Sequence, residues 1–335
     1  MRFSYCPAAS TVREFAAAAA AAERAGYERV WANELHRNPF VQLAAAACAT
    51  SRIGLATGIA LAFVRSPLTT ALAALDLDEL SDGRFSLGLG SGVARLNEDW
   101  HHARFGKPVP HLRETVALVR QFMATADLGE TITFEGEYER ASVRGFRRPY
   151  PPARRDMPVY LAAVGPALTT LAGEIADGWI AHELCSPYYL RTAALPRLTA
   201  GLQRAGRKRE EITVVASACC VLDDDARRAK RAAARHVAFY ASVRTYESFF
   251  ALHGFAAEAA AIRECFRRGD LDGMAEACTD DMVDAFTFAG RADDVREALH
   301  AYDGLADEVK LSAPALLAGE DTARTTHRML LGLLG

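Results

Sequence analysis

Short apolar runs alternate along the chain with longer segments in which apolar positions recur at helical spacing. Residues 1–6 form the first apolar run and predict a strand. Thr11 and Glu14 then form a capping box, and apolar positions follow every three or four residues up to Gly26, which suits the end of a helix. A second strand is predicted at residues 29–33. A strand, a helix and a strand within about thirty residues indicate one crossover unit of a parallel sheet.

The same alternation continues to the end of the chain. Asn38-Pro39 and Ser66-Pro67 are typical helix starts, in which a capping side chain is followed by proline in the first turn. Further strands are predicted at 53–59, 84–90, 159–163, 179–182, 212–222 and 309–312, with helices between them. Eight strands alternating with helices favour an α/β fold, a (β/α)8 TIM barrel with insertions. A doubly wound sheet has fewer strands and a glycine-rich first turn, whereas residues 7–10 contain no glycine.

Two segments interrupt this alternation. Residues 127–157 predict an insertion with a hairpin around Glu135-Gly136 and a loop containing Arg144, Arg147, Arg148, Arg154 and Arg155, which we interpret as solvated. Residues 239–302 predict a helical extension after the seventh strand, placed to cover the barrel mouth. Because no linker is evident, we expect one barrel domain over residues 1–335.

Composition narrows the class of protein. Hydrophobic residues make up 50% of the chain, enough for a large core, and no apolar run approaches the roughly 20 residues that a membrane span needs. The formal net charge of −3 lacks the basic bias of proteins that bind nucleic acid or membrane surfaces. The seven cysteines form no CxxC pair, and the alanine run at 16–22 lacks the basic flank of a signal peptide. We therefore expect a cytoplasmic protein with reduced thiols and neither a nucleic-acid nor a membrane partner.

The chemistry of a (β/α)8 barrel lies at the carboxyl ends of its strands. Many of the residues predicted there are small, as a flat ligand that approaches the backbone requires. The chain has no HxxxH, HExxH or GxSxG motif, so we expect no metal site and no hydrolase nucleophile. The predicted strand-end residues are Cys6, Asn33, Glu34, Thr57, Gly58, Ile59, Gly88, Gly90, Gly92, Ala163, Gly165, His182, Glu183, Ser217 and Ser312.

Two of these strand ends admit both a structural and a ligand-binding interpretation. In residues 88–92 (GLGSG), Gly88 and Gly90 would point inward, either to make room for barrel packing or to let a ligand approach. In residues 162–166 (AAVGP), a helix begins at Gly165-Pro166. The free amides of that helix could hold a phosphate, although the spacing by itself favours a simple cap.

Four stretches of the first 180 residues keep an order and spacing typical of one enzyme family. They are AAERAGYERVWANE (21–34), SRIGLATGIALAFVRSP (51–67), LDELSDGRFSLGLGSGVARLNEDWH (77–101) and PVYLAAVGPALTTLAGEIADGWI (158–180). Together they resemble the luciferase-like flavin monooxygenases and, within them, the F420-dependent oxidoreductases and methylene-tetrahydromethanopterin reductase. The resemblance implies a tricyclic ring across the barrel mouth, with a cis peptide bond at Gly58-Ile59 pressed against one face. The fourth stretch favours coenzyme F420 over FMN, and the family implies a homodimer.

The resemblance also assigns roles to individual residues. Glu34, His36 and Glu98 are the candidates for a catalytic proton donor or acceptor. Many relatives carry Glu-His after the tryptophan of the second strand, whereas here Leu35 follows Glu34 and the histidine comes one place later. The expected active-site histidine is therefore displaced. The implied cofactor contacts, taken together with the strand-end rule, are Asn33, Thr57, Gly58, Ile59, Gly88, Gly90, Ala162, Ala163, Gly165, Pro166 and His182.

The implied function is hydride transfer between C5 of F420 and a small organic substrate. One alternative is an FMN-dependent monooxygenase that receives reduced flavin from a separate flavin reductase. The displaced histidine leaves a third interpretation open, a non-catalytic flavin-binding relative. The identity of the substrate depends on the strand-end loops and on the helical extension.

Overall fold

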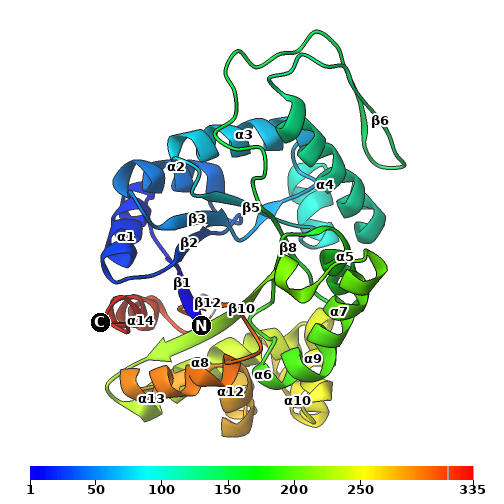
Figure 1. The fold of residues 1–335 in the computed structure, drawn as a ribbon. Coiled ribbons are helices and arrows are strands. Elements are labelled where there is room, and N and C mark those ends of the chain that lie inside the picture. Colours follow the sequence, from blue (N-terminus) through cyan, green and yellow to red (C-terminus); the bar gives the residue numbers. More distant parts are fainter. Residues whose placement is uncertain (315–316, 335) are drawn as a thin grey trace.

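Eight parallel strands close into a barrel in the computed structural model, which describes residues 1–314 and 317–334 (Figure 1). Neighbours pair in the order β1-β2-β3-β5-β8-β9-β10-β12, and β12 pairs with β1 to close the ring. The predicted TIM-barrel fold is therefore confirmed. The strands are β1 (Arg2–Cys6), β2 (Arg29–Ala32), β3 (Gly54–Thr57), β5 (Phe85–Gly90), β8 (Val159–Ala162), β9 (Gly178–Ile180), β10 (Thr213–Leu222) and β12 (Glu308–Ser312).

Two short parallel strands extend this sheet beyond the predicted eight. β4 (Ala60–Leu61) pairs with the end of β5, and β11 (Phe288–Gly290) pairs with the end of β10. β11 interrupts the stretch that the sequence predicts as helical. Segments of two or three residues are too short to show a periodicity, so the pattern of apolar positions could not reveal them.

Helices surround the barrel, and local capping explains where several of them begin. Thr11 Oγ1 accepts the N–H of Glu14 at 3.1 Å, and Asn38 Oδ1 accepts the N–H of Phe40 at 3.0 Å. Among the helices of the described chain, none combines the length and the apolar character that a membrane crossing requires. The helices are α1 (Val12–Arg24), α2 (Pro39–Ala49), α3 (Pro67–Leu80), η1 (Leu96–Trp100), α4 (Pro108–Thr125), α5 (Pro166–Ile175), α6 (Pro187–Tyr189), η2 (Leu190–Ala194), α7 (Leu195–Arg204), η3 (Arg209–Glu211), α8 (Ala226–Ser242), η4 (Arg244–Tyr246), α9 (Glu247–Leu252), α10 (Ala256–Arg267), α11 (Leu271–Glu276), α12 (Asp280–Phe286), α13 (Ala292–Ala298), η5 (Leu299–Tyr302) and α14 (Glu320–Leu331).

The interior of the barrel is filled by a small cluster separate from the large core beneath the helices. Fully buried Trp31 lies in this cluster, and its Nε1 donates to Ser4 Oγ at 2.8 Å. Below it, Arg29 Nη1 donates to Glu308 Oε2 at 2.6 Å. These contacts close the barrel beneath its mouth. The cluster consists of Cys6, Trp31, Ala56, Tyr160, Ile180 and Val215.

The segment 127–157 carries the hairpin of β6 (Ile132–Glu135) and β7 (Arg140–Val143), which projects away from the barrel in Figure 1. Buried Arg148 pairs with Asp76 of α3 at 2.7 Å. Arg154 pairs with buried Asp78 of the same helix at 2.9 Å. The interpretation of this loop as solvated is therefore wrong for both arginines, because they anchor the segment to α3.

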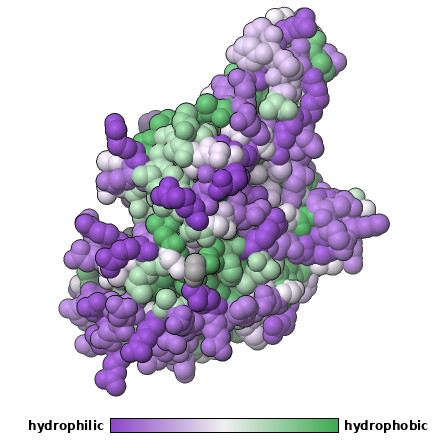
Figure 2. All heavy atoms as spheres, turned by 60° about the vertical axis from the view of Figure 1, so that its left-hand side comes forward, coloured by the Kyte–Doolittle hydropathy of each residue, from purple (hydrophilic) through white to green (hydrophobic). Residues whose placement is uncertain are grey.

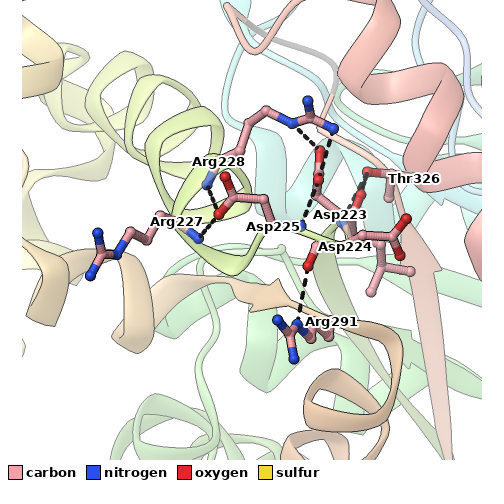
Figure 3. Close-up of polar contacts among 8 residues, drawn as sticks. Asp223, Asp224, Asp225, Arg227, Arg228, Arg291 and Thr326 are labelled. Atoms are coloured by element: carbon pink, nitrogen blue, oxygen red, sulfur yellow. Dashed lines mark hydrogen bonds and ion pairs between the residues drawn. The ribbon is translucent and has the colours of Figure 1, made fainter.

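Consecutive aspartates fix the start of α8 at the end of β10 (Figure 3). Asp225 caps the helix, with Oδ1 accepting the N–H of Arg228 at 3.3 Å. The side chain of Arg228 returns to Asp223 at 2.6 Å, and Arg291 Nε donates to the carbonyl of Asp224 at 3.0 Å. These contacts join the start of α8 to the residue between β11 and α13.

Candidate active site

The carboxyl ends of the barrel strands surround a cavity of about 660 Å³. Residues from β3, β5, β8 and the segments after them are small or apolar, whereas residues from β9, β10, β12 and η4 are mostly polar. Because β5 and β12 lie opposite each other in the closed ring, the two sets face one another. We call them the apolar wall (Gly58, Ile59, Gly90, Ala162, Val164 and Leu168) and the polar wall (His182, Glu183, Ser217, Tyr246, Lys310 and Ser312).

Two glycines keep the apolar wall flat. The peptide bond between Gly58 and Ile59 is cis, as the resemblance implies. A Cβ added at Gly58 would lie 2.7 Å from Cε3 of Trp31, and one added at Gly90 would lie 2.6 Å from Cδ1 of Ile59. The absence of a side chain at Gly58 lets the bulge pack against Trp31, and its absence at Gly90 lets a planar ring lie directly against the backbone and Ile59.

Glu34 holds the bulge that carries Gly58 and Ile59. Its backbone N–H donates to the carbonyl of Ile59 at 3.0 Å, and its Oε2 accepts the N–H of Leu61 at 2.7 Å. The same carboxylate forms a two-pronged ion pair with Arg65, one prong of which measures 2.9 Å. With its oxygens engaged in this way, Glu34 is suited to position the apolar wall rather than to exchange a proton with a ligand.

His182 offers a hydrogen-bond donor from the polar wall. Its Nδ1 accepts the N–H of Leu184 at 3.1 Å, which assigns the ring proton to Nε2. Burial lowers the pKa of His182 to about 4, and the charge of Lys310 adds to this effect while Glu183 opposes it. His182 is therefore a neutral imidazole at neutral pH, and its Nε2–H has no acceptor among the residues the structure describes.

Glu183 is the centre of a buried ion pair beside His182. Tyr240 donates its hydroxyl hydrogen to Glu183, and His236 Nε2 lies 3.6 Å from the same carboxylate oxygen. Burial alone would raise the pKa of Glu183, but its neighbours hold it at about 2, and the pKa of His236 is raised although burial opposes this. Cys219 completes a group of possible metal ligands within 4.8 Å of one another. Tyr240 donates to the carboxylate, whereas neither ring nitrogen of His236 has a hydrogen-bond partner among the described residues.

Lys310 is a cation inside the barrel. Its register opposite Ser4 of β1 and Ser217 of β10 turns its side chain toward the interior, where it lines the cavity. Its Nζ lies 5.8 Å from the centre of the Trp31 ring. Within the described chain no carboxylate pairs with it and no acceptor receives a hydrogen bond from it, and Glu308 on the same strand is paired with Arg29 instead.

The cavity gathers many, but not all, of the residues predicted from the sequence. His36 and Glu98 are exposed and do not line it. In the segment after β2, the neighbouring Arg37 donates to the carbonyl of Ser10, which follows β1. The predicted residues that do line the cavity are Asn33, Glu34, Gly58, Ile59, Gly90, Ala162 and His182, together with the strand-end residues Cys6, Gly92, Glu183, Ser217 and Ser312.

The remaining predicted contacts lie behind the cavity or between its lining residues. Thr57 Oγ1 accepts the N–H of Gly88 at 2.8 Å and donates to its carbonyl at 2.7 Å, which fastens β3 to β5. Ala163 is buried, and its carbonyl accepts Trp179 Nε1 at 3.1 Å. Gly165 and Pro166 begin α5 between Val164 and Leu168, which both line the cavity.

Sequence reasoning missed three residues of this site. Lys310 precedes the end of its strand, so a rule based on strand ends overlooks it, although its alternation with Ser312 places both on one face. Tyr246 comes from the helical region after β10, and its ring lies 4.9 Å from that of His182. His236 carried no local signal that distinguishes it from other helical histidines.

Known proteins resemble this chain over most of its length. It matches the luciferase-like monooxygenase profile over residues 3–308. It is 34% identical over 301 residues to an uncharacterized protein of Mycobacterium tuberculosis, covering 87% of each chain. It is 30% identical to the 5,10-methylenetetrahydromethanopterin reductase of Archaeoglobus fulgidus, covering 83% of this chain and 82% of the reductase.

A solved structure shares the fold. The coenzyme F420-dependent tetrahydromethanopterin reductase of Methanopyrus kandleri superposes with a TM-score of 0.83 at 24% identity, covering 98% of this chain and 96% of the reductase. At that identity, the likeness establishes the arrangement of the elements and no more.

Proposed function

The chain belongs to the luciferase-like monooxygenase family, and from this premise we propose that it is an oxidoreductase that uses coenzyme F420 to move a hydride to or from a small organic substrate. The name of a relative supports the cofactor, since a protein of Mycobacterium tuberculosis that is 30% identical over 304 residues is named a putative coenzyme F420-dependent oxidoreductase. The observation that carries the proposal is the flat apolar wall at the barrel mouth.

The residues of the cavity fit a planar tricyclic ring. A Cβ at Gly90 would lie 2.6 Å from Ile59, and the Cβ of Ala162 lies 3.5 Å from the same added atom. Small side chains therefore leave a slot beside Ile59 that larger ones would fill. Gly58, Ile59, Gly90 and Ala162 would hold the ring in this slot, with the start of α5 at its edge.

F420, when bound, supplies or accepts a hydride at carbon C5 of its ring. The chain then has to orient the substrate and exclude water. Tyr246 belongs to the polar wall, and the centre of its ring lies 4.9 Å from that of the His182 ring. Neutral His182 donates a hydrogen bond from Nε2–H to a substrate oxygen, because its Nδ1 is occupied by the N–H of Leu184. Glu183 remains ionised beside it and orients Tyr240.

Fluorescence titration of the purified protein with F420 and with FMN tests the proposal. We expect the dissociation constant for F420 to be at least about tenfold lower, a difference of about 1.4 kcal/mol. Tighter binding of FMN would replace the proposal with the monooxygenase alternative, which oxygen consumption in the presence of reduced FMN would then establish. Tight F420 binding without turnover of any carbonyl or alcohol substrate would indicate a non-catalytic relative.

We also propose a homodimer, supported by an apolar outer surface. Helix α2 contains no charged residue, and Val41 on it is 55% exposed. Figure 2 turns the side that carries α1 and α2 forward, and apolar atoms gather there between polar ones. Light scattering should give about twice the 36.3 kDa of one chain, and V41E should shift the species toward one chain. A wild-type mass of one chain would refute the dimer.

A further inference from the structure

We propose that the substrate is a small organic acid whose carboxylate binds Lys310 at the bottom of the polar wall; this rests on the proposed function and adds a substrate class to it. An ammonium group has three N–H donors, and none of them meets an acceptor among the described residues. Lys310 is half-buried and lines the cavity, so a ligand that enters the cavity can supply the anionic partner that the chain does not.

The depth of Lys310 defines what can reach it. Strand β12 runs toward the mouth, so Lys310 lies deeper than Ser312, which is two positions later on the same face. The Ser217 hydroxyl beside Lys310 already donates to the carbonyl of Ala181 at 2.7 Å. A ligand must therefore enter the barrel to reach the ammonium group, and Ser312 supplies a second hydroxyl on its way.

The charges around Lys310 leave it uncompensated. Glu183 lines the same cavity but is paired with His236 at 3.6 Å and with the Tyr240 hydroxyl. The other group close to the ammonium, His182, is neutral. Cys6 stays a thiol because burial raises its pKa, although Lys310 and the Asn33 amide oppose this. Glu183 thus has partners of its own, and no carboxylate of the described polar wall pairs with Lys310.

The opposed walls assign the anion to the substrate rather than to the cofactor. A ring that lies on the apolar wall at β3, β5 and β8 has its free face toward β12, on the other side of the barrel. The molecule that exchanges a hydride with that face must occupy the space between, next to Lys310 and His182. A carboxylate fits the ammonium, and the neutral Nε2–H of His182 fits a second, uncharged oxygen.

The test compares acids with their esters. Pyruvate, acetoacetate and cinnamate, each beside its methyl ester, are titrated into the F420-loaded protein while cofactor fluorescence is followed. We expect the acids to bind at least about tenfold more tightly than the esters, and K310M to remove this preference, as loss of a charged hydrogen bond predicts. K310R should retain part of it. The control is K208M, which removes the same charge from exposed Lys208, outside the cavity lining.

Three outcomes would overturn the inference. Equal binding of acids and esters by the wild type would remove the anion preference. Weaker F420 binding by K310M, with acid binding unchanged, would assign Lys310 to the cofactor. Retention of the acid preference in K310M would place the carboxylate elsewhere. If F420 itself does not bind, thermal protection of the cofactor-free protein by the same acids still measures the Lys310 contact, so the two failures are distinguishable.

Discussion

The hydroxyl oxygen of Tyr5 lies 2.8 Å from Nδ1 of His327, which joins the first strand of the barrel to the last helix. The other ring nitrogen of His327, Nε2, accepts the backbone N–H of Ala8 at 3.1 Å. The ring proton therefore resides on Nδ1 and is donated to Tyr5. This contact holds the loop after β1 against α14, and it requires a neutral imidazole.

We expect this contact to make stability depend on pH. Burial lowers the pKa of His327 from 6.5 to about 4, so the unfolded chain takes up a proton at a higher pH than the folded one. The neutral His327 contact contributes fully to the free energy of unfolding above pH 6.5. This contribution is lost as the pH falls toward 4, and its upper bound is on the order of 3 kcal/mol. Urea unfolding at about pH 7.5 and about pH 5 measures the difference. H327Q should shrink it, whereas H36Q, at an exposed position, should not.

Replacement of Glu34 separates a positioning role from proton transfer. In the native chain the N–H of Leu61 donates to Glu34 Oε2 at 2.7 Å. The amide oxygen of E34Q can still accept this hydrogen bond, but the variant loses the ion pair with Arg65. We expect E34Q to weaken F420 binding by less than about tenfold and E34A by about thirtyfold or more, because a buried hydrogen bond to a charged group contributes about 2 kcal/mol. Fluorescence titration measures both. An unchanged F420 affinity in E34A would argue against the positioning role.

Substitutions of His36 and Glu98 should leave the site intact. Both side chains are exposed and neither lines the cavity. We expect H36A and E98A to keep F420 affinity and turnover within about twofold of the wild type, as is usual for surface changes of about 0.5 kcal/mol or less. A large fall in turnover with unchanged binding would show that a closed form of the enzyme brings one of them to the substrate.

Two glycines of β5 should respond differently to the same substitution. In G88A the new Cβ would lie 1.9 Å from the carbonyl oxygen of Thr57, so β3 and β5 must separate. We expect a loss of about 3 kcal/mol in the free energy of unfolding. In G90A the new Cβ meets the flexible end of Ile59 at 2.6 Å. That variant should remain folded but bind F420 about tenfold more weakly, about 1.4 kcal/mol. Urea unfolding and titration together distinguish the two effects.

The periodicity of apolar positions predicted the barrel because each strand and helix is long enough to show its own repeat. The position of strand ends then identified both sides of the cavity, since closure of a parallel barrel brings Gly58, Gly90, His182 and Ser312 to one mouth. The roles of individual side chains could not be predicted in this way. Whether Glu34 is free or paired depends on Arg65, which lies on a different segment and meets it only in the folded chain.

His36 and Tyr246 illustrate the limit of local reasoning. His36 is close to the end of β2 in the sequence, but its side chain is exposed and does not line the cavity. Tyr246 lies far from any strand end in the sequence, and the path of the chain after β10 returns it to the cavity. Both outcomes are decided by the direction of a loop, which side-chain periodicity does not encode.

The two walls of the cavity come from separate stretches of the polypeptide. The apolar wall is supplied by residues 58–168 and the polar wall by residues 182–312. Changes in one stretch can alter what lies on that side of the barrel without disturbing the other. Descendants of such a chain can therefore keep an inherited coenzyme while they diversify the metabolites they accept, and a hybrid gene joined between β8 and β9 would exchange one property and conserve the other.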